Sequence, residues 1–169
     1  MTGDPAGGSG NHRPRRLSER TGRWLLNLYP PFLCQRIRVS EIGPGFTRVT
    51  VRVSQSLLNR NLNGTIFGGT IYSAADPIYA LMFWQVFARE GIATRVWLRR
   101  ATVRFLEPAS GKLTLRFELS AADLHEARSR LARDGRHVHT CETAVADGRG
   151  RTCAVIETEA QVALRTPPS

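Results

Sequence analysis

Residues 61–85 read NLNGTIFGGTIYSAADPIYALMFWQ. The run behind the paired glycines stays apolar from Ile71 to Phe87 without alternation, and Asp76 is its only charged side chain. An apolar run of this length predicts a helix that is buried on all sides. A single helix of that kind needs cover all round, which a strongly curved antiparallel sheet wrapped around it provides.

Segments on both sides of this helix alternate between apolar and polar residues, as half-buried strands do. Before it, Val49, Val51 and Val53 lie in the second strand of a hairpin that turns at residues 43–45. The later predicted elements are strands over 96–105 and 112–119, a helix over 121–133, and a hairpin of 137–145 and 152–163 around DGRG at 147–150. The sequence therefore predicts an α+β fold with a flanking helix besides the long central one.

A short helix is also expected near the N-terminus. Residues 17–28 have apolar side chains at helical spacing, Ser18 is a suitable N-cap, and Pro30 ends the pattern. We expect this helix to cover an edge of the core.

The length of 169 residues fits one domain with a sizeable core and is too short for two ordinary ones. Residues 1–16 are rich in Gly, Pro and Arg and have almost nothing apolar, so they cannot offset the entropy of ordering. We therefore expect a disordered basic tail over 1–16 and a single domain over 17–165.

No uninterrupted apolar run approaches the roughly 18 residues of a membrane span, because Asp76 and Pro77 divide the run from Ile71 to Phe87. The apolar patch at residues 24–28 is too short for a signal peptide and is followed by two prolines, so a cytoplasmic location is expected. The three cysteines form no CxxC pair and have no histidine at metal-ligand spacing, and we expect no metal site.

The net charge of +10 rests on arginine, because Lys112 is the only lysine among 24 basic residues. Such a charge can attract nucleic acid, anionic lipid or the phosphates of coenzyme A. The arginines are spread along the whole chain, which favours a biased composition over a dedicated patch. Nucleic-acid binding ranks last, because the basic and aromatic residues do not interleave as in an RNA-binding sheet.

The frame around the central helix resembles that of hotdog-fold thioesterases, especially the PaaI-like group and its DUF4442 (YiiD C-terminal-like) relatives. That group carries Asn, two residues, Gly, two residues, His-Gly-Gly, six residues and an acid. The same frame is present here from Asn61 through Gly64 to Asp76 with every spacing kept, and Phe67 stands in place of His.

Other segments extend the resemblance. The strand after the helix ends in RFLEP at 104–108, as in the family, and the segments LLNLYPPFL and AADPIYALMFWQ are similar to the DUF4442 subgroup. The resemblance covers roughly Ile37–Ala163 and implies a hotdog fold, in which a curved antiparallel sheet wraps a long central helix.

The resemblance implies an acyl-CoA thioesterase in which the backbone amide of Gly68 polarises the thioester carbonyl. The first amides of a helix lack an intrahelical partner and lie at the positive end of its dipole, which suits that role. Asp76 is then the general base on water, or a nucleophile that forms an anhydride. As an alternative, Asp76 caps a second helical segment that starts at Pro77.

The same frame suggests substrate contacts. Gly69 would let a bulky thioester approach, and Asn61 would contact substrate, with close packing and turn chemistry as the respective alternatives. Phe67 can neither donate nor accept a hydrogen bond. With Tyr72 and Tyr79 it would line an acyl or aryl pocket, unless these aromatic residues are plain core.

Arg99 and Arg100 follow the helix and could hold the phosphates of coenzyme A, although alternating arginines are also usual on the solvent face of a strand. Coenzyme A enters only as part of the substrate, and no cofactor is expected. The resemblance implies a homodimer or homotetramer with a shared site, and a sheet with one helix has edges that need cover. The loss of His at Phe67 keeps a second function open, a hotdog protein that binds acyl thioesters or another apolar ligand without turnover.

Overall fold

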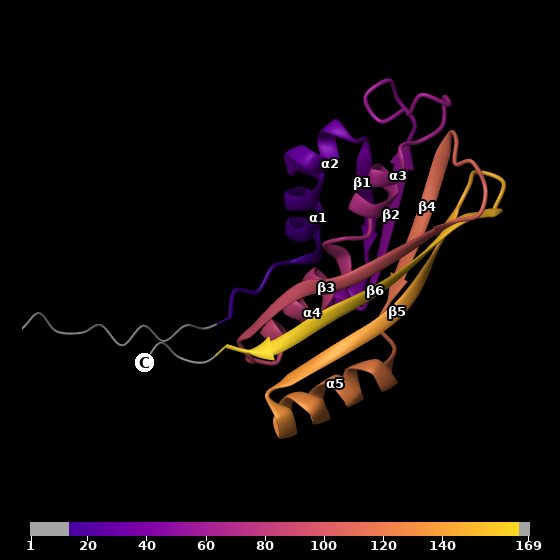
Figure 1. Cartoon of the computed structure of the whole chain (residues 1–169). Helices are drawn as coiled ribbons and strands as arrows, with labels where there is room; N and C mark the ends of the chain where they lie inside the picture. Colours follow the sequence, from indigo (N-terminus) through magenta and orange to yellow (C-terminus); the bar gives the residue numbers. More distant parts are fainter. Residues whose placement is uncertain (1–13, 166–169) are drawn as a thin grey trace, which may run out of the picture.

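The computed structural model describes residues 14–165, and these form a six-stranded sheet in the order β1-β2-β4-β5-β6-β3. The strands are β1 (Ile37–Ile42), β2 (Arg48–Ser54), β3 (Thr94–Phe105), β4 (Lys112–Glu118), β5 (Arg136–Ala146) and β6 (Thr152–Leu164). The helices are α1 (Glu19–Leu28), α2 (Pro30–Cys34), the 3-10 turn η1 (Pro44–Phe46), α3 (Gly68–Ser73), α4 (Ile78–Arg89) and α5 (Ala121–Asp134). All neighbouring strands are antiparallel, and the predicted α+β class is confirmed (Figure 1).

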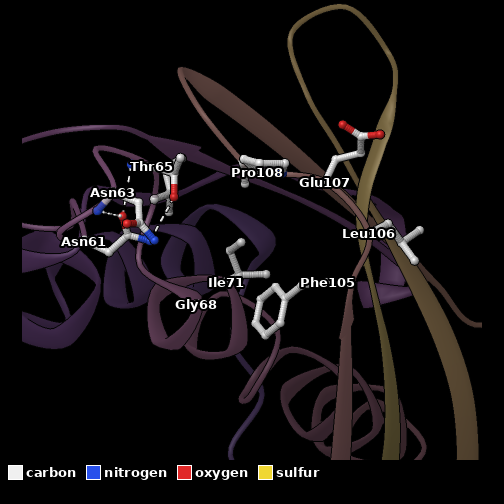
Figure 2. Close-up of a pocket in the computed structure, with 11 residues that line it drawn as sticks. Asn61, Asn63, Thr65, Gly68, Ile71, Phe105, Leu106, Glu107 and Pro108 are labelled. Atoms are coloured by element: carbon white, nitrogen blue, oxygen red, sulfur yellow. Dashed lines mark hydrogen bonds between the residues drawn. The ribbon is translucent and has the colours of Figure 1, made fainter.

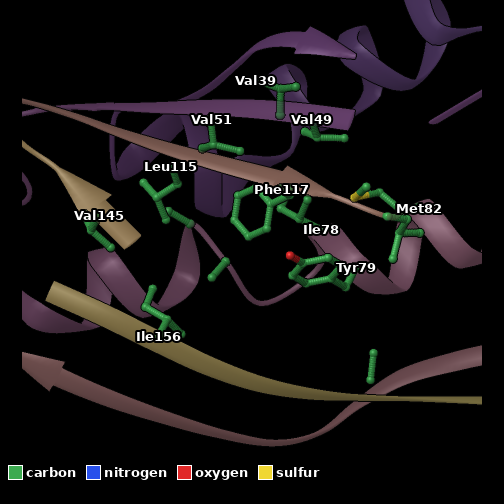
Figure 3. Close-up of a cluster of buried hydrophobic side chains, with 14 of the residues drawn as sticks. Val39, Val49, Val51, Ile78, Tyr79, Met82, Leu115, Phe117, Val145 and Ile156 are labelled. Carbon is green, nitrogen blue, oxygen red and sulfur yellow. The ribbon is translucent and has the colours of Figure 1, made fainter. Parts of the chain in front are cut away.

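The sheet curves around α4, and the core lies between the two. Ile78, Tyr79 and Met82 of α4 point toward the inner faces of the strands (Figure 3). Their partners alternate along β2 and β4, where Val51 pairs with Leu115 in the strand register. The period of two in these strands thus gives one buried face, as the sequence predicted.

The central helix is divided into two helices, which differs from the one long helix expected from the apolar run and agrees with the alternative of a second segment near Pro77. Its first part, α3, ends at Ser73, and the second, α4, starts at Ile78. Pro77 lies at the break, because its ring disfavours a helical residue before it and removes one amide donor. Tyr72 of α3 is exposed, whereas most residues of α4 are buried.

The edge strand β1 is covered by α1. The Asn27 side chain donates to Val39 O at 3.0 Å, and Val39 N donates to Asn27 Oδ1 at 2.8 Å. Asn27 thereby replaces the missing neighbour strand, which is one way that proteins protect a sheet edge. The predicted edge-covering role of the N-terminal helix is confirmed, and Ser18 caps it by accepting a hydrogen bond from Thr21 N at 3.0 Å.

The other edge strand, β3, has no such cover from residues 14–165. It ends the strand order on the side opposite β1, and within residues 14–165 its outer side pairs with no other strand. A bulge between Leu98 and Arg100 interrupts its register with β6. The exposed side chain of Trp97 precedes that bulge.

Between β4 and β5 the chain inserts α5. These two strands pair only through Thr114 with Ala146 and Leu115 with Val145, so the rest of β5 lacks a strand on this side. The helix begins with a capping box and ends at Gly135, which has a φ of 68°. It buries its apolar stripe against β5, and the predicted flanking helix is confirmed.

The ordered contacts of the N-terminal segment start before the domain boundary expected at residue 17. Arg16 Nε donates to Ala88 O at 3.0 Å, which ties the segment to the end of α4. The rest of the tail expected to be disordered, residues 1–13, lies outside the described residues. Across residues 14–165, no helix has the length and apolar character needed to cross a membrane.

Candidate functional site

A pocket of about 660 Å³ opens beside the start of α3, and we call it the loop pocket. It lies between the loop after β2 and the β3–β4 turn, and Phe105 and Ile71 lie next to one another within it (Figure 2). Its lining consists of Asn61, Asn63, Thr65, Ile66, Gly68, Ile71, Phe105, Leu106, Glu107, Pro108 and Ala109. Two of the predicted site residues, Asn61 and Gly68, are thus brought to one cavity.

The side chain of Asn61 is engaged in its own loop. Its Oδ1 accepts from Asn63 N at 3.0 Å and from Thr65 N at 3.1 Å, and its Nδ2 donates to Thr65 Oγ1 at 2.8 Å. This is an Asx-type turn, in which the side chain takes the place of a backbone acceptor. Gly64, with a φ of 78°, completes the turn. The turn chemistry considered as an alternative for Asn61 is therefore present.

Two aromatic rings explain the paired glycines in steric terms. A Cβ on Gly68 would lie 2.8 Å from Phe105 Cζ, and a Cβ on Gly69 would overlap the Phe67 ring. Gly68 also starts α3, and its amide has no acceptor within residues 14–165. Close packing accounts for Gly69, which does not line the loop pocket, while Gly68 combines close packing with a free amide at the cavity.

A second cavity of about 340 Å³ lies between the N-terminal helices and the α3–α4 junction, and we call it the helix groove. Its lining consists of Leu25, Leu26, Tyr29, Pro31, Phe32, Ser73, Asp76 and Pro77. The sequence patterns do not predict a site at residues 25–32. The helical spacing of Leu25 and Tyr29 was the available signal, because residues four apart share a helix face.

Asp76 is half-buried and lies on the wall of the helix groove. Tyr72 Oη donates a long hydrogen bond to Asp76 Oδ1 at 3.4 Å, and no other side chain among residues 14–165 contributes a hydrogen bond to this carboxylate. Partial burial and the nearby Asp76 charge raise the pKa of Tyr72, which keeps its phenol protonated. The helix α4 has no side-chain cap, so the capping role considered for Asp76 is not seen.

Within one chain, Gly68 and Asp76 line different cavities. Both cavities lie beside α3. Ile71 of this helix lines the loop pocket, and Ser73 lines the helix groove. These two residues are about 200° apart around a helix, which places the cavities on opposite sides of α3. The two predicted catalytic groups therefore do not converge in a single copy.

The model of the family "Domain of unknown function (DUF4442)" matches residues 18–162. The chain belongs to the DUF4442 family. No curated protein matches the chain in sequence.

Solved structures share the fold of this DUF4442 chain. The Pseudomonas aeruginosa protein of unknown function PA5026 superposes with a TM-score of 0.78 at 20% identity, covering 90% of this chain and 99% of its own. The Haemophilus influenzae thioesterase HI1161 gives 0.64 at 15% identity, covering 89% and 94%. PaaI, from the phenylacetic acid degradation operon of E. coli, gives 0.55 at 12%, also covering 89% and 94%. At these identities the likeness shows the fold, and the hotdog fold predicted from the sequence is confirmed.

The three aromatic residues expected to line a pocket have different surroundings in the DUF4442 chain. Tyr79 is 5% exposed and faces the sheet, with its ring 5.3 Å from that of Phe117, so it is a core residue and not a pocket wall. Phe67 is 56% exposed, and its ring lies against Gly69 without lining either cavity. Tyr72 is exposed between the two cavities, where its hydroxyl reaches Asp76.

Arg99 and Arg100 line neither cavity of the DUF4442 chain. Both side chains are exposed at the β3 bulge, and Arg100 forms an ion pair with Glu159 at 3.6 Å. Arg99 has no ion-pair partner within residues 14–165. The solvent-face interpretation fits Arg100, while Arg99 retains an unpaired charge on the uncovered edge of the sheet.

Proposed function

We propose that this chain is a cytoplasmic acyl-CoA thioesterase that hydrolyses an acyl or aryl thioester with Asp76. The observation that carries the proposal is the position of this carboxylate. It borders an apolar groove, and one of its oxygens accepts no hydrogen bond from another side chain among residues 14–165. A carboxylate in such surroundings has an acceptor available for a water molecule. It can therefore act as a general base beside a bound acyl group.

The reaction needs two groups at the thioester carbonyl. With Asp76 as base, water attacks the carbonyl carbon, its proton passes to the carboxylate, and an amide donor stabilises the oxyanion. The C–S bond then breaks, and the thiolate leaves with the proton that Asp76 had taken. With Asp76 as nucleophile, the carboxylate attacks the carbonyl carbon and the C–S bond breaks, so that the thiolate leaves and an anhydride forms. Water then hydrolyses the anhydride, which restores the Asp76 carboxylate, and a proton from that water passes to the thiolate. In both schemes we assign the amide donor to Gly68.

We propose that two copies complete the site, as a homodimer or within a homotetramer. Gly68 and Asp76 line separate cavities in one chain, so the Gly68 amide would meet Asp76 of the partner subunit. The uncovered edge of β3 and the exposed rings of Trp97 and Phe105 support an interface there, because unpaired strand edges and exposed aromatic residues favour association. Arg99 lies on the same strand and is a candidate contact for the phosphates of coenzyme A, with Arg100 beside it.

A panel of acyl-CoAs with a thiol reagent tests the activity, and Asp76→Asn tests the residue. Loss of a general base should lower kcat by about 100-fold or more, while the melting temperature stays unchanged. Glu41→Gln is the matched control, since Glu41 is an exposed carboxylate on β1 that lines neither cavity. Unchanged turnover in Asp76→Asn would remove Asp76 from the mechanism.

A second candidate function is binding of an acyl thioester or another apolar ligand without turnover. Phe67 favours it, because this residue replaces the family's histidine and offers no hydrogen bond. The same panel separates the two functions. If no acyl-CoA is hydrolysed but ligands still raise the melting temperature, binding without turnover is the function.

A further inference from the structure

The helix groove is apolar along the side formed by α1 and α2. Phe32 is buried at its base, with the Tyr29 ring edge-on at 5.8 Å, and Leu26 packs against the same core. Leu25 and Tyr29 form the rim, since they are 50% and 49% exposed. A ligand that entered the groove would cover these two side chains and remove apolar surface from water.

The opposite wall of the groove carries two polar side chains, those of Ser73 and Asp76. Ser73 Oγ donates to Gly69 O at 2.8 Å, so its hydroxyl is already engaged. Among residues 14–165, Asp76 is the only charged residue that lines the groove, and one of its oxygens accepts no hydrogen bond from them. An anion would be repelled here, and no lining side chain carries a positive charge that would bind it. The groove therefore suits an uncharged apolar group whose reacting end lies at Asp76.

The size of the groove limits that group. Its volume of about 340 Å³ is at the lower end of ligand pockets, which span roughly 300–1,000 Å³. Allowing roughly 30 Å³ for each methylene-sized group, as for a water molecule, the groove holds about eleven of them. The rest of a long-chain fatty acyl group would extend beyond the groove.

We propose that the helix groove is the acyl-binding subsite and that it selects short to medium aliphatic acyl groups through α1 and α2. This inference rests on the proposed thioesterase function and adds the substrate class. The acyl chain lies along Leu25, Leu26 and Phe32, and the thioester carbonyl lies at Asp76. The coenzyme A part extends away from the groove, since the groove offers it no positive charge.

A chain-length series tests the subsite. Each buried methylene contributes about 0.8 kcal/mol, so kcat/KM should rise about fourfold per added CH₂ and stop rising at or before roughly eleven carbons. A flat series from four to ten carbons would overturn the inference.

A matched pair of variants tests the location. Leu25 and Leu28 are leucines on α1 with exposures of 50% and 56%, but only Leu25 lines the groove. Leu25→Ala should flatten the chain-length slope, and Leu28→Ala should leave it unchanged. Leu25→Trp should fill the groove and move the end of the rise to shorter chains. Equal effects of the two alanine variants would place the acyl chain elsewhere.

Binding without chemistry separates this inference from the proposed function. Alkyl-CoA thioethers cannot be hydrolysed, and calorimetric titration with a series of them gives the affinity per CH₂ directly. If acyl-CoAs are not hydrolysed but the thioethers show the fourfold increment and the Leu25→Ala loss, the subsite stands and the thioesterase function fails. If acyl-CoAs are hydrolysed but Leu25→Ala leaves the affinity gain per CH₂ of the thioethers unchanged, the thioesterase function stands and the subsite fails.

Discussion

Gln85 of α4 binds the backbone just before α1, where its Oε1 accepts a hydrogen bond from Leu17 N at 2.7 Å. Its Nε2 donates to Arg15 O at 3.2 Å, and the side chain is 0% exposed. One turn further on, Arg89 Nη2 donates to Leu17 O at 2.6 Å. The central helix thereby fixes the segment that leads into α1, and with it the outer wall of the helix groove.

Replacing Gln85 should destabilise the whole domain. Gln85→Leu conserves volume but leaves Leu17 N buried without an acceptor, which costs about 1–3 kcal/mol. Urea unfolding measures this loss. Gln161→Leu on β6 is the control, because that half-exposed side chain makes no hydrogen bond within residues 14–165. Equal losses in the two variants would show that the contact with Leu17 contributes nothing specific.

Gly22→Ala should also be destabilising, although alanine is the better helix former by about 1 kcal/mol. The new Cβ would lie 2.7 Å from Cζ of Phe46, which is fully buried beneath the guanidinium of Arg89. Overpacking of this kind costs about 1–3 kcal/mol. Gly148→Ala is the control in thermal unfolding, since the nearest atom to its new Cβ would be Lys112 O, at 3.9 Å. A more stable Gly22→Ala protein would mean that Phe46 can move aside.

Stability should fall as the pH drops below about 6.5. Burial lowers the pKa of His137 and of His139 from the ordinary 6.5, and His139 lowers that of His137 further. The unfolded chain binds protons at these sites more readily than the folded one, so the free energy of unfolding decreases on acidification. Denaturant unfolding between pH 7 and pH 5 measures the slope. His139→Gln should reduce it, while His125→Gln, at an exposed position on α5, should not.

The proposed assembly predicts at least a dimer in light scattering at micromolar concentration. Trp97→Lys puts a charge on the uncovered edge strand and should raise the dissociation constant about 30-fold, for a loss of about 2 kcal/mol. Trp24→Lys is the control, since Trp24 is an exposed tryptophan on α1, which packs at the opposite edge of the sheet. A wild-type monomer at this concentration would contradict the shared site.

Local patterns predicted most of the secondary structure. The alternation at Val49–Val53 and the turn at 147–150 placed strands whose ends differ from the observed ones by at most two residues. The differences between predicted and observed helices lie at prolines. The pattern predicts Pro30 only as the end of α1, but Pro30 also starts α2, because proline fits the first turn of a helix. Pro77 breaks an apolar run whose composition alone predicts one helix.

The site was predictable in part. The spacing from Asn61 to Asp76 located the segment that borders both cavities, and Asn61 shows the turn chemistry expected of its residue type. Spacing could not show that Tyr79 faces the core while Tyr72 reaches solvent. The two residues lie on either side of the break before Pro77.

The sequence by itself determined the frame from Asn61 to Asp76 and the curved sheet around an apolar helix. These depend on patterns within a few residues of one another. Only the tertiary structure decided that Gly68 and Asp76 face different cavities and that α1 and α2 form an apolar groove beside Asp76. The groove joins residues 25–32 with 73–77, and contacts between segments so far apart arise from packing, which local periodicity does not encode.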